Sequence, residues 1–124
     1  MRLRDAELAL VLAPPVALTG GVAPAAVTVR YAEGTLHGFL ELRNTADSLL
    51  AHGDLLQVPR DEGVETRLVF QFTDSSSFKE TVRFTQHGVF RLERYQLEQR
   101  GHAFEQDLSV ELAGDGQYVV ETKS

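Results

Sequence analysis

Cysteine is absent from the 124 residues of this chain. Its absence excludes disulfide bonds, zinc sites built on thiolates and thiol nucleophiles, and it is compatible with either a cytoplasmic or an exported bacterial protein. Runs of Lys and Arg are absent too, and 12 basic residues against 18 acidic ones give a net charge of −6. A phosphate backbone would be repelled by this mean field, so we expect no nucleic-acid partner.

Long apolar runs and helical periodicity are also scarce. The mostly apolar segment Leu8–Leu18 is shorter than the roughly 20 residues that cross a bilayer, so no stable membrane span is expected. After position 26 the only candidate for a helical turn is Ala46–Ala51. With 43% apolar residues and this length, the chain can form one domain with one core.

The N-terminal region has the features of an export signal. Met1–Arg4 is basic, an apolar segment follows, and Ala23–Ala25 is a small-x-small processing site, which together resemble a secretory signal peptide. Acidic residues and a proline pair inside this region argue for the alternative of a mobile arm. We therefore expect residues 1–26 to be a signal peptide or mobile N-terminal arm. The protein is then exported, to the periplasm or outside the cell; the alternative is a cytoplasmic location.

The stretch Val64–Arg100 carries the strongest pattern in the chain. Apolar residues take alternate positions from Val64 to Phe72 and again from Phe78 to Phe84, which is the period of half-buried strands. Asp74–Ser77 lies between them and is rich in residues that form turns. A hairpin is predicted, followed by a second turn at Gln86–Gly88 and a third strand.

The third strand changes phase along its length. Phe90 and Leu92 share one parity, whereas Tyr95 and Leu97 share the other. One extra residue in the strand would restore all four to one face, so a β-bulge is predicted near Glu93 and Arg94.

Shorter alternating segments, beginning with Val27–Tyr31, extend the pattern to residues 27–124. The fold class is therefore all-β, a single antiparallel domain of about eight strands in a meander, which forms a strongly curved sheet or an incomplete barrel. Gly53 marks a bulge or a close approach within a strand that Pro59 ends. The last strand runs to the end of the sequence, which suggests truncation and an open edge through which the chain could form a homodimer.

Four segments carry a resemblance to known proteins. His37–Arg43, Ala51–Leu55, Gln57–Arg60 and Tyr95–Phe104 look similar to uncharacterised bacterial exported proteins with a long antiparallel sheet. Those proteins are longer, which implies that this chain could be part of a longer one, and they bring no catalytic residues. The strand order is also similar in outline to the periplasmic lipoprotein-carrier fold, in which a curved, unclosed barrel holds lipid.

The phenylalanines suggest the leading function. Phe70, Phe72, Phe78, Phe84 and Phe90 are expected on one side of a sheet that has no helix to cover it. They pack into the sheet's own core, or they meet a partner or an apolar ligand. We expect a non-enzymatic binding or structural module, with Phe70, Phe72, Phe84 and Phe90 holding an apolar or lipid-like ligand.

An enzyme is the alternative. His52 and Asp54 share a strand face two residues apart and could form a hydrogen-bonded pair for general-base chemistry in a small hydrolase or isomerase, with Arg94 or Tyr95 nearby. The four histidines show no spacing that suits a metal, and no metal or cofactor is expected. Ser75–Ser77 are expected to form a turn and not a nucleophile.

Charged residues alternate with the apolar ones along the same strands. We expect them to lie as cross-strand pairs on one or both faces of the central hairpins, where they form a solvated face or offer arginines to an anionic head group. The residues in this ladder are Glu65, Arg67, Lys79, Glu80, Arg83, Arg91, Glu93 and Arg94.

Overall fold

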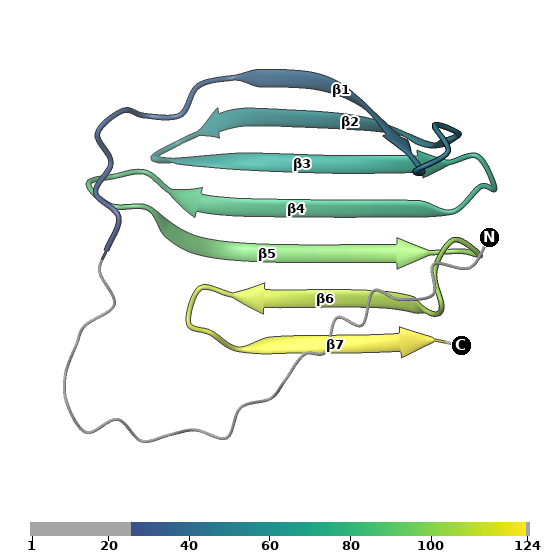
Figure 1. Cartoon of the computed structure of the whole chain (residues 1–124). Helices are drawn as coiled ribbons and strands as arrows, with labels where there is room; N and C mark the ends of the chain where they lie inside the picture. Colours follow the sequence, from purple (N-terminus) through teal and green to yellow (C-terminus); the bar gives the residue numbers. More distant parts are fainter. Residues whose placement is uncertain (1–25, 124) are drawn as a thin grey trace.

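The computed structural model describes residues 26–123, which form one open sheet of seven antiparallel strands (Figure 1). The strands are β1 (Leu36–Arg43), β2 (Leu49–Arg60), β3 (Gly63–Phe72), β4 (Ser77–Thr85), β5 (Arg91–Arg100), β6 (Asp107–Ala113) and β7 (Tyr118–Lys123). They lie in the sheet in sequence order, and each contacts only its neighbours in the chain. The predicted all-β antiparallel meander is therefore confirmed, with β1 and β7 as its two edges.

The expected first strand is shorter than the pattern suggested. Thr28 forms an isolated bridge with Val89, and the two flanking backbone hydrogen bonds do not extend into a ladder. The sheet thus has seven strands in place of about eight. The predicted signal peptide or arm, residues 1–26, lies almost entirely outside the described residues. Within residues 26–123 no helix has the length and apolar character needed to cross a membrane.

Two local expectations need correction. Ala46–Ala51 contains no helical turn: the side chain of Asn44 accepts hydrogen bonds from the backbone of Ala46 and Ser48, which makes a hairpin turn that leads into β2. Strand β2 also continues through Pro59 and ends at Arg60. Proline is tolerated there because the pairing of β2 with β1 ends at Gln57, so this part of β2 has a neighbour on one side only.

The predicted β-bulge is confirmed. Arg83 of β4 pairs with Arg94 of β5, but the next β4 residue, Phe84, pairs with Leu92. Glu93 is the extra residue, and it places Leu92 on the same face as Tyr95. The phase change in the sequence therefore keeps a single apolar face continuous along β5.

The register divides the strands into two faces of opposite character. We call the first the apolar face, because it is the face of Phe70 and its cross-strand neighbours. Its apolar members are Leu36, Leu40, Leu42, Ala51, Leu55, Pro59, Val64, Leu68, Phe70, Phe72, Phe78, Val82, Phe84, Leu92, Tyr95, Leu97, Leu108, Val110, Leu112, Tyr118 and Val120. Within β1–β7, the only charged residue on it is Glu80; the other charged residues of the strands lie on the opposite, polar face.

The apolar face lacks a second layer among the described residues. Only Ala51 and Val64 are fully buried apolar side chains in this part of the chain. Most residues of β3–β6 on this face are half-buried by their neighbours, and the edge strands are more open: Leu36 is 50% exposed and Tyr118 is 62% exposed. The described part of the chain is thus a single layer and not a closed core.

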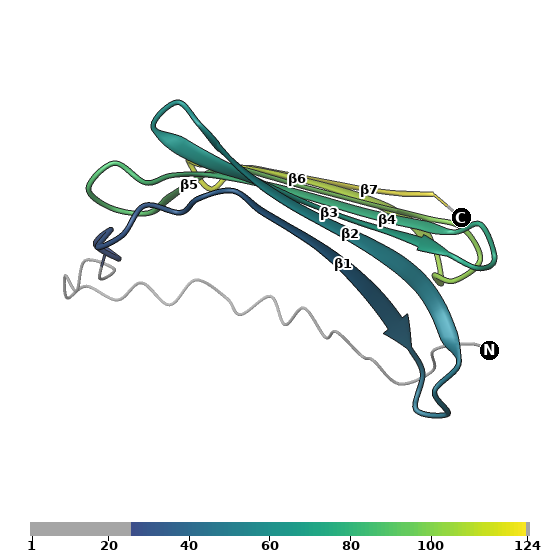
Figure 2. The ribbon, with the colours of Figure 1, turned by 90° about the horizontal axis from the view of Figure 1, so that it is seen from above.

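The sheet bends toward the apolar face near Gly53. A Cβ atom added to Gly53 would lie 2.5 Å from the ring of Phe70 and 3.0 Å from the Cβ of Leu40. Side chains from both flanking strands therefore converge over this glycine, as they do on the inner side of a bent sheet. Figure 2 shows β1 and β2 curving out of the plane of the other strands. The expected close approach at Gly53 is confirmed.

Candidate binding surface

Three aromatic pairs stand on the apolar face. Phe84 and Phe90 meet edge to face at one end, with ring centroids 5.6 Å apart. Phe70 and Phe78 face each other across β3 and β4 at 6.3 Å. The expectation that these phenylalanines share one side of the sheet is confirmed.

The third pair depends on a loop that the sequence did not single out. Phe104 lies in the connection between β5 and β6, and its ring meets that of Phe72 edge to face at 5.3 Å. The loop is held by Ser76, which is 1% exposed and whose Oγ accepts a 2.9 Å hydrogen bond from the backbone N–H of Ala103. A turn serine thus positions the aromatic ring that closes this end of the face.

Near the centre of the apolar face lies one polar pair. Glu80 of β4 is placed between Leu68 and Leu97 of the adjacent strands, and its Oε2 accepts a 2.8 Å hydrogen bond from the hydroxyl of Tyr95. Partial burial, together with the hydrogen bond and the negative charge of Glu80, raises the pKa of Tyr95 to about 12. The charge ladder was expected on one or both faces of the sheet, and Glu80 is its member on the apolar face.

Four of the other ladder residues, Glu65, Arg83, Glu93 and Arg94, form ion pairs on the polar face. Arg83 and Arg94 lie opposite each other, and an acid partner offsets each charge. Arg83 donates a 2.7 Å hydrogen bond to Glu93, which raises the pKa of Arg83, and Arg94 lies 3.6 Å from Glu111. These pairs are solvent-exposed, so each contributes little to stability.

The predicted catalytic pair does not form. The imidazole that contacts Asp54 belongs to His37 on β1, with Nε2 3.1 Å from Oδ2, and both side chains are nearly half exposed. His52 projects from the same face but lies opposite Glu41 and Gln71 in the register. Asp54 therefore pairs with a diagonal neighbour on the adjacent strand β1. The spacing along β2 alone had suggested His52 as its partner.

The remaining members of the expected enzyme site lie elsewhere. Arg94 is on β5, three strands and about 14 Å from β2. Tyr95 points to the opposite face of the sheet from His52 and Asp54. Residues 26–123 contain no group of three His, Asp or Glu residues arranged to hold a metal. Arg94 and Tyr95 thus do not join His52 and Asp54 in one site.

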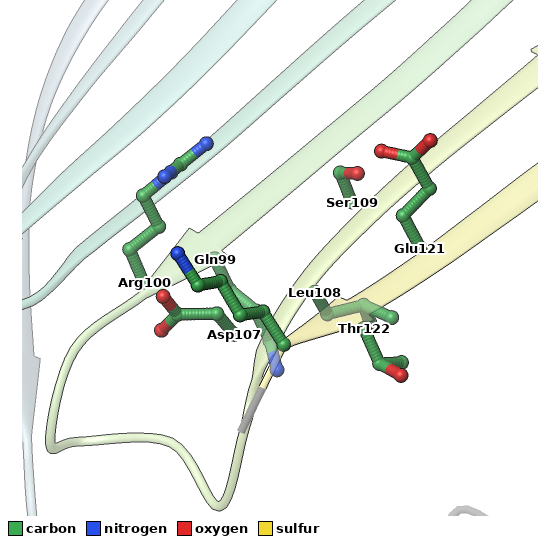
Figure 3. A pocket seen from close by; sticks show the side chains of 8 residues that line it. Gln99, Arg100, Asp107, Leu108, Ser109, Glu121 and Thr122 are labelled. Atoms are coloured by element: carbon green, nitrogen blue, oxygen red, sulfur yellow. The ribbon is translucent and has the colours of Figure 1, made fainter.

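A shallow hollow of about 520 Å³ lies at one end of β5–β7 (Figure 3). Ser109 and Glu121 stand side by side in it, from paired positions of β6 and β7. Two of its charged groups are engaged locally: Arg100 contacts Glu98 at 3.2 Å, and Asp107 accepts a hydrogen bond from the backbone of Gly101. This hollow offers mixed polarity without convergent groups, and the apolar face is the stronger candidate surface.

Comparisons with known proteins give no relative to set beside this geometry. Neither family models, nor curated proteins, nor solved structures include a match to the chain.

Proposed function

We propose that this protein is a non-enzymatic binding module that holds an apolar, lipid-like ligand on its apolar face. The observation that carries the proposal is the contrast between the two faces. Among the strands described, one face carries a single charged residue, Glu80, and the other carries all the rest. Antiparallel sheets with apolar side chains on one face and polar ones on the other typically have the apolar face covered and the polar face in water.

The size of the apolar face supports the proposal. Seven strands spaced by about 4.8 Å, each about eight residues long, give a face on the order of 900 Å². The apolar side chains on this footprint are half-buried or exposed, apart from Ala51 and Val64, and contiguous exposed apolar patches larger than a few hundred Å² mark interaction sites. The aromatic pairs at both ends and the bend at Gly53 give the face a bounded shape into which acyl chains could fit.

Native mass spectrometry of protein purified from its own host tests this function. We expect the chain to carry a co-purifying apolar molecule that is released by organic extraction. A monomer with no bound molecule, whose apolar face proves inaccessible to solvent, would count against the proposal. Export of the chain, which we also propose, is tested by N-terminal sequencing of the same material.

The edge strand β7 favours a second candidate function, self-association. Tyr118, Val119 and Val120 are 49–62% exposed, and β7 pairs on one side only. An unpaired strand of this kind can accept a strand from another molecule. The proposal is a homodimer joined edge to edge, which would extend the apolar face into a longer one. The mass spectrum distinguishes it, because a dimer without ligand supports self-association alone.

A further inference from the structure

We infer that the ligand of the apolar face carries a hydrogen-bond donor, neutral or cationic, and that Glu80 and Tyr95 hold this donor. The inference rests on the proposed function and names the ligand class that the same surface selects. It concerns the polar end of an otherwise apolar molecule: a hydroxyl or an ammonium group is accepted, and a carboxylate or phosphate is rejected.

The position of Glu80 is the first step. A carboxylate within an apolar surface loses hydration when that surface is covered, and this cost is large unless a partner is supplied. The Oε2 atom of Glu80 accepts the hydrogen bond of the Tyr95 hydroxyl, and Oε1 is left for another group. Covering the face with a purely apolar molecule would therefore bury an incompletely paired charge, whereas a donor on the ligand would pair it.

The chemistry of the pair sets the type of partner. Tyr95 has one hydroxyl proton, and it is donated to Glu80. The pair therefore presents only acceptors to a ligand: the second carboxylate oxygen and the lone pairs of the phenol. An anionic head group would meet negative charge and no donor, whereas an ammonium or hydroxyl group would gain a charge-assisted hydrogen bond.

Three other polar side chains on this face have partners within the chain. Thr66 donates to Gln57, whose amide donates in turn to the carbonyl of Gly34. The amide of Gln99 donates to the carbonyl of Gln106. Thr122 and Tyr118 lie at the β7 edge, so Glu80 and Tyr95 form the polar pair that a ligand meets at the centre of the face.

An apolar tail has a path away from this anchor. The cross-strand row that contains Glu80 continues through Leu97, Val110 and Val120 on β5, β6 and β7. Three strand spacings give this row a length of about 14 Å. A ligand with its donor at Glu80 can therefore lay an alkyl chain across the apolar rows toward the β7 edge.

Three probes with the same alkyl chain test the inference on the full chain: dodecylamine, 1-dodecanol and dodecanoate, each titrated below its micelle concentration or solubility limit and followed by native mass spectrometry. We expect dodecylamine to bind at least about tenfold more tightly than dodecanoate, with 1-dodecanol between them. Equal binding of dodecanoate and dodecylamine would overturn the inference and leave the proposed function standing. Failure of all three probes to bind would overturn both.

Matched variants separate the anchor from the overall charge. The net charge of −6 favours any cation, so Glu65→Gln, which removes the same charge from the polar face of β3, is the control for Glu80→Gln. Glu80→Gln should reduce the preference for the amine over the acid by at least about tenfold, while Glu65→Gln should leave it within about twofold. Equal effects of the two substitutions would show that the selectivity comes from net charge, and would contradict the anchor.

Discussion

Gly53 lies beneath the ring of Phe70, so close that a Cβ on Gly53 would come within 2.5 Å of the ring's Cε1 atom. Gly53→Ala should therefore lower the free energy of unfolding by about 1–3 kcal/mol, because Phe70 must leave its position beside Phe78. Gly38 is the matched control: it lies on the same face, in β1, with open space around it. Gly38→Ala should be neutral or stabilising by up to about 1 kcal/mol. Urea denaturation measures both, and equal losses would contradict the bend.

The bulge at Glu93 predicts the effect of removing one residue from β5. Deleting Glu93 removes the extra residue and leaves Leu92 and Arg94 in their pairing with β4, so β5 becomes a regular strand whose apolar residues stay on the apolar face. The deletion variant should therefore keep a cooperative unfolding transition. Glu93→Ala keeps the residue count and removes only the exposed contact with Arg83, so it should cost no more than about 1 kcal/mol. Loss of cooperative unfolding in the deletion variant would contradict the bulge.

The raised pKa of Tyr95 predicts how the free energy of unfolding changes at high pH. Its pKa is raised from 10 in the unfolded chain to about 12 in the sheet, so the folded state keeps the proton longer than the unfolded state does. The contribution to stability is complete below pH 10 and is lost as the pH rises toward 12. Denaturant midpoints measured across this range should fall less steeply for Tyr95→Phe than for the parent. Identical pH profiles would show that Tyr95 titrates as it does in the unfolded chain.

The hydrogen bond of Ser76 predicts that this turn residue stabilises the loop that carries Phe104. Ser76→Ala leaves the part-buried N–H of Ala103 without its acceptor, which should cost about 1 kcal/mol of stability. The loop that carries Phe104 should then exchange its amide hydrogens faster, while the amides of β2 should be unchanged. Uniform acceleration across the whole sheet would show a general loss of stability and would contradict a local role.

The sequence predicted the strands well because alternation along an antiparallel strand is read directly from residue order. It also predicted the bulge, since Leu92 and Tyr95 differ in parity. Glu80 shares the parity of Phe78 and Val82, and that signal could have placed it on the apolar face. The charged residues around Glu80 instead placed it in the charge ladder.

Contacts between distant positions were harder to predict. The pairing of Asp54 with His37 depends on the register between β1 and β2, which the spacing within one strand does not determine. The contact of Phe104 with Phe72 likewise requires the path of a loop that has no periodic pattern.

The most direct test of the binding face compares two adjacent residues of β6 that point to opposite sides. Val110 is on the apolar face and Ser109 is on the polar face, and both are half-buried. The measurement is the affinity for an uncharged apolar dye, Nile red, by fluorescence titration of Val110→Asp and Ser109→Asp beside the parent. We predict that Val110→Asp weakens binding by at least about tenfold and that Ser109→Asp leaves it within about twofold. Equal binding by all three proteins, or no binding by the parent, would contradict the assignment of the apolar face as the ligand site.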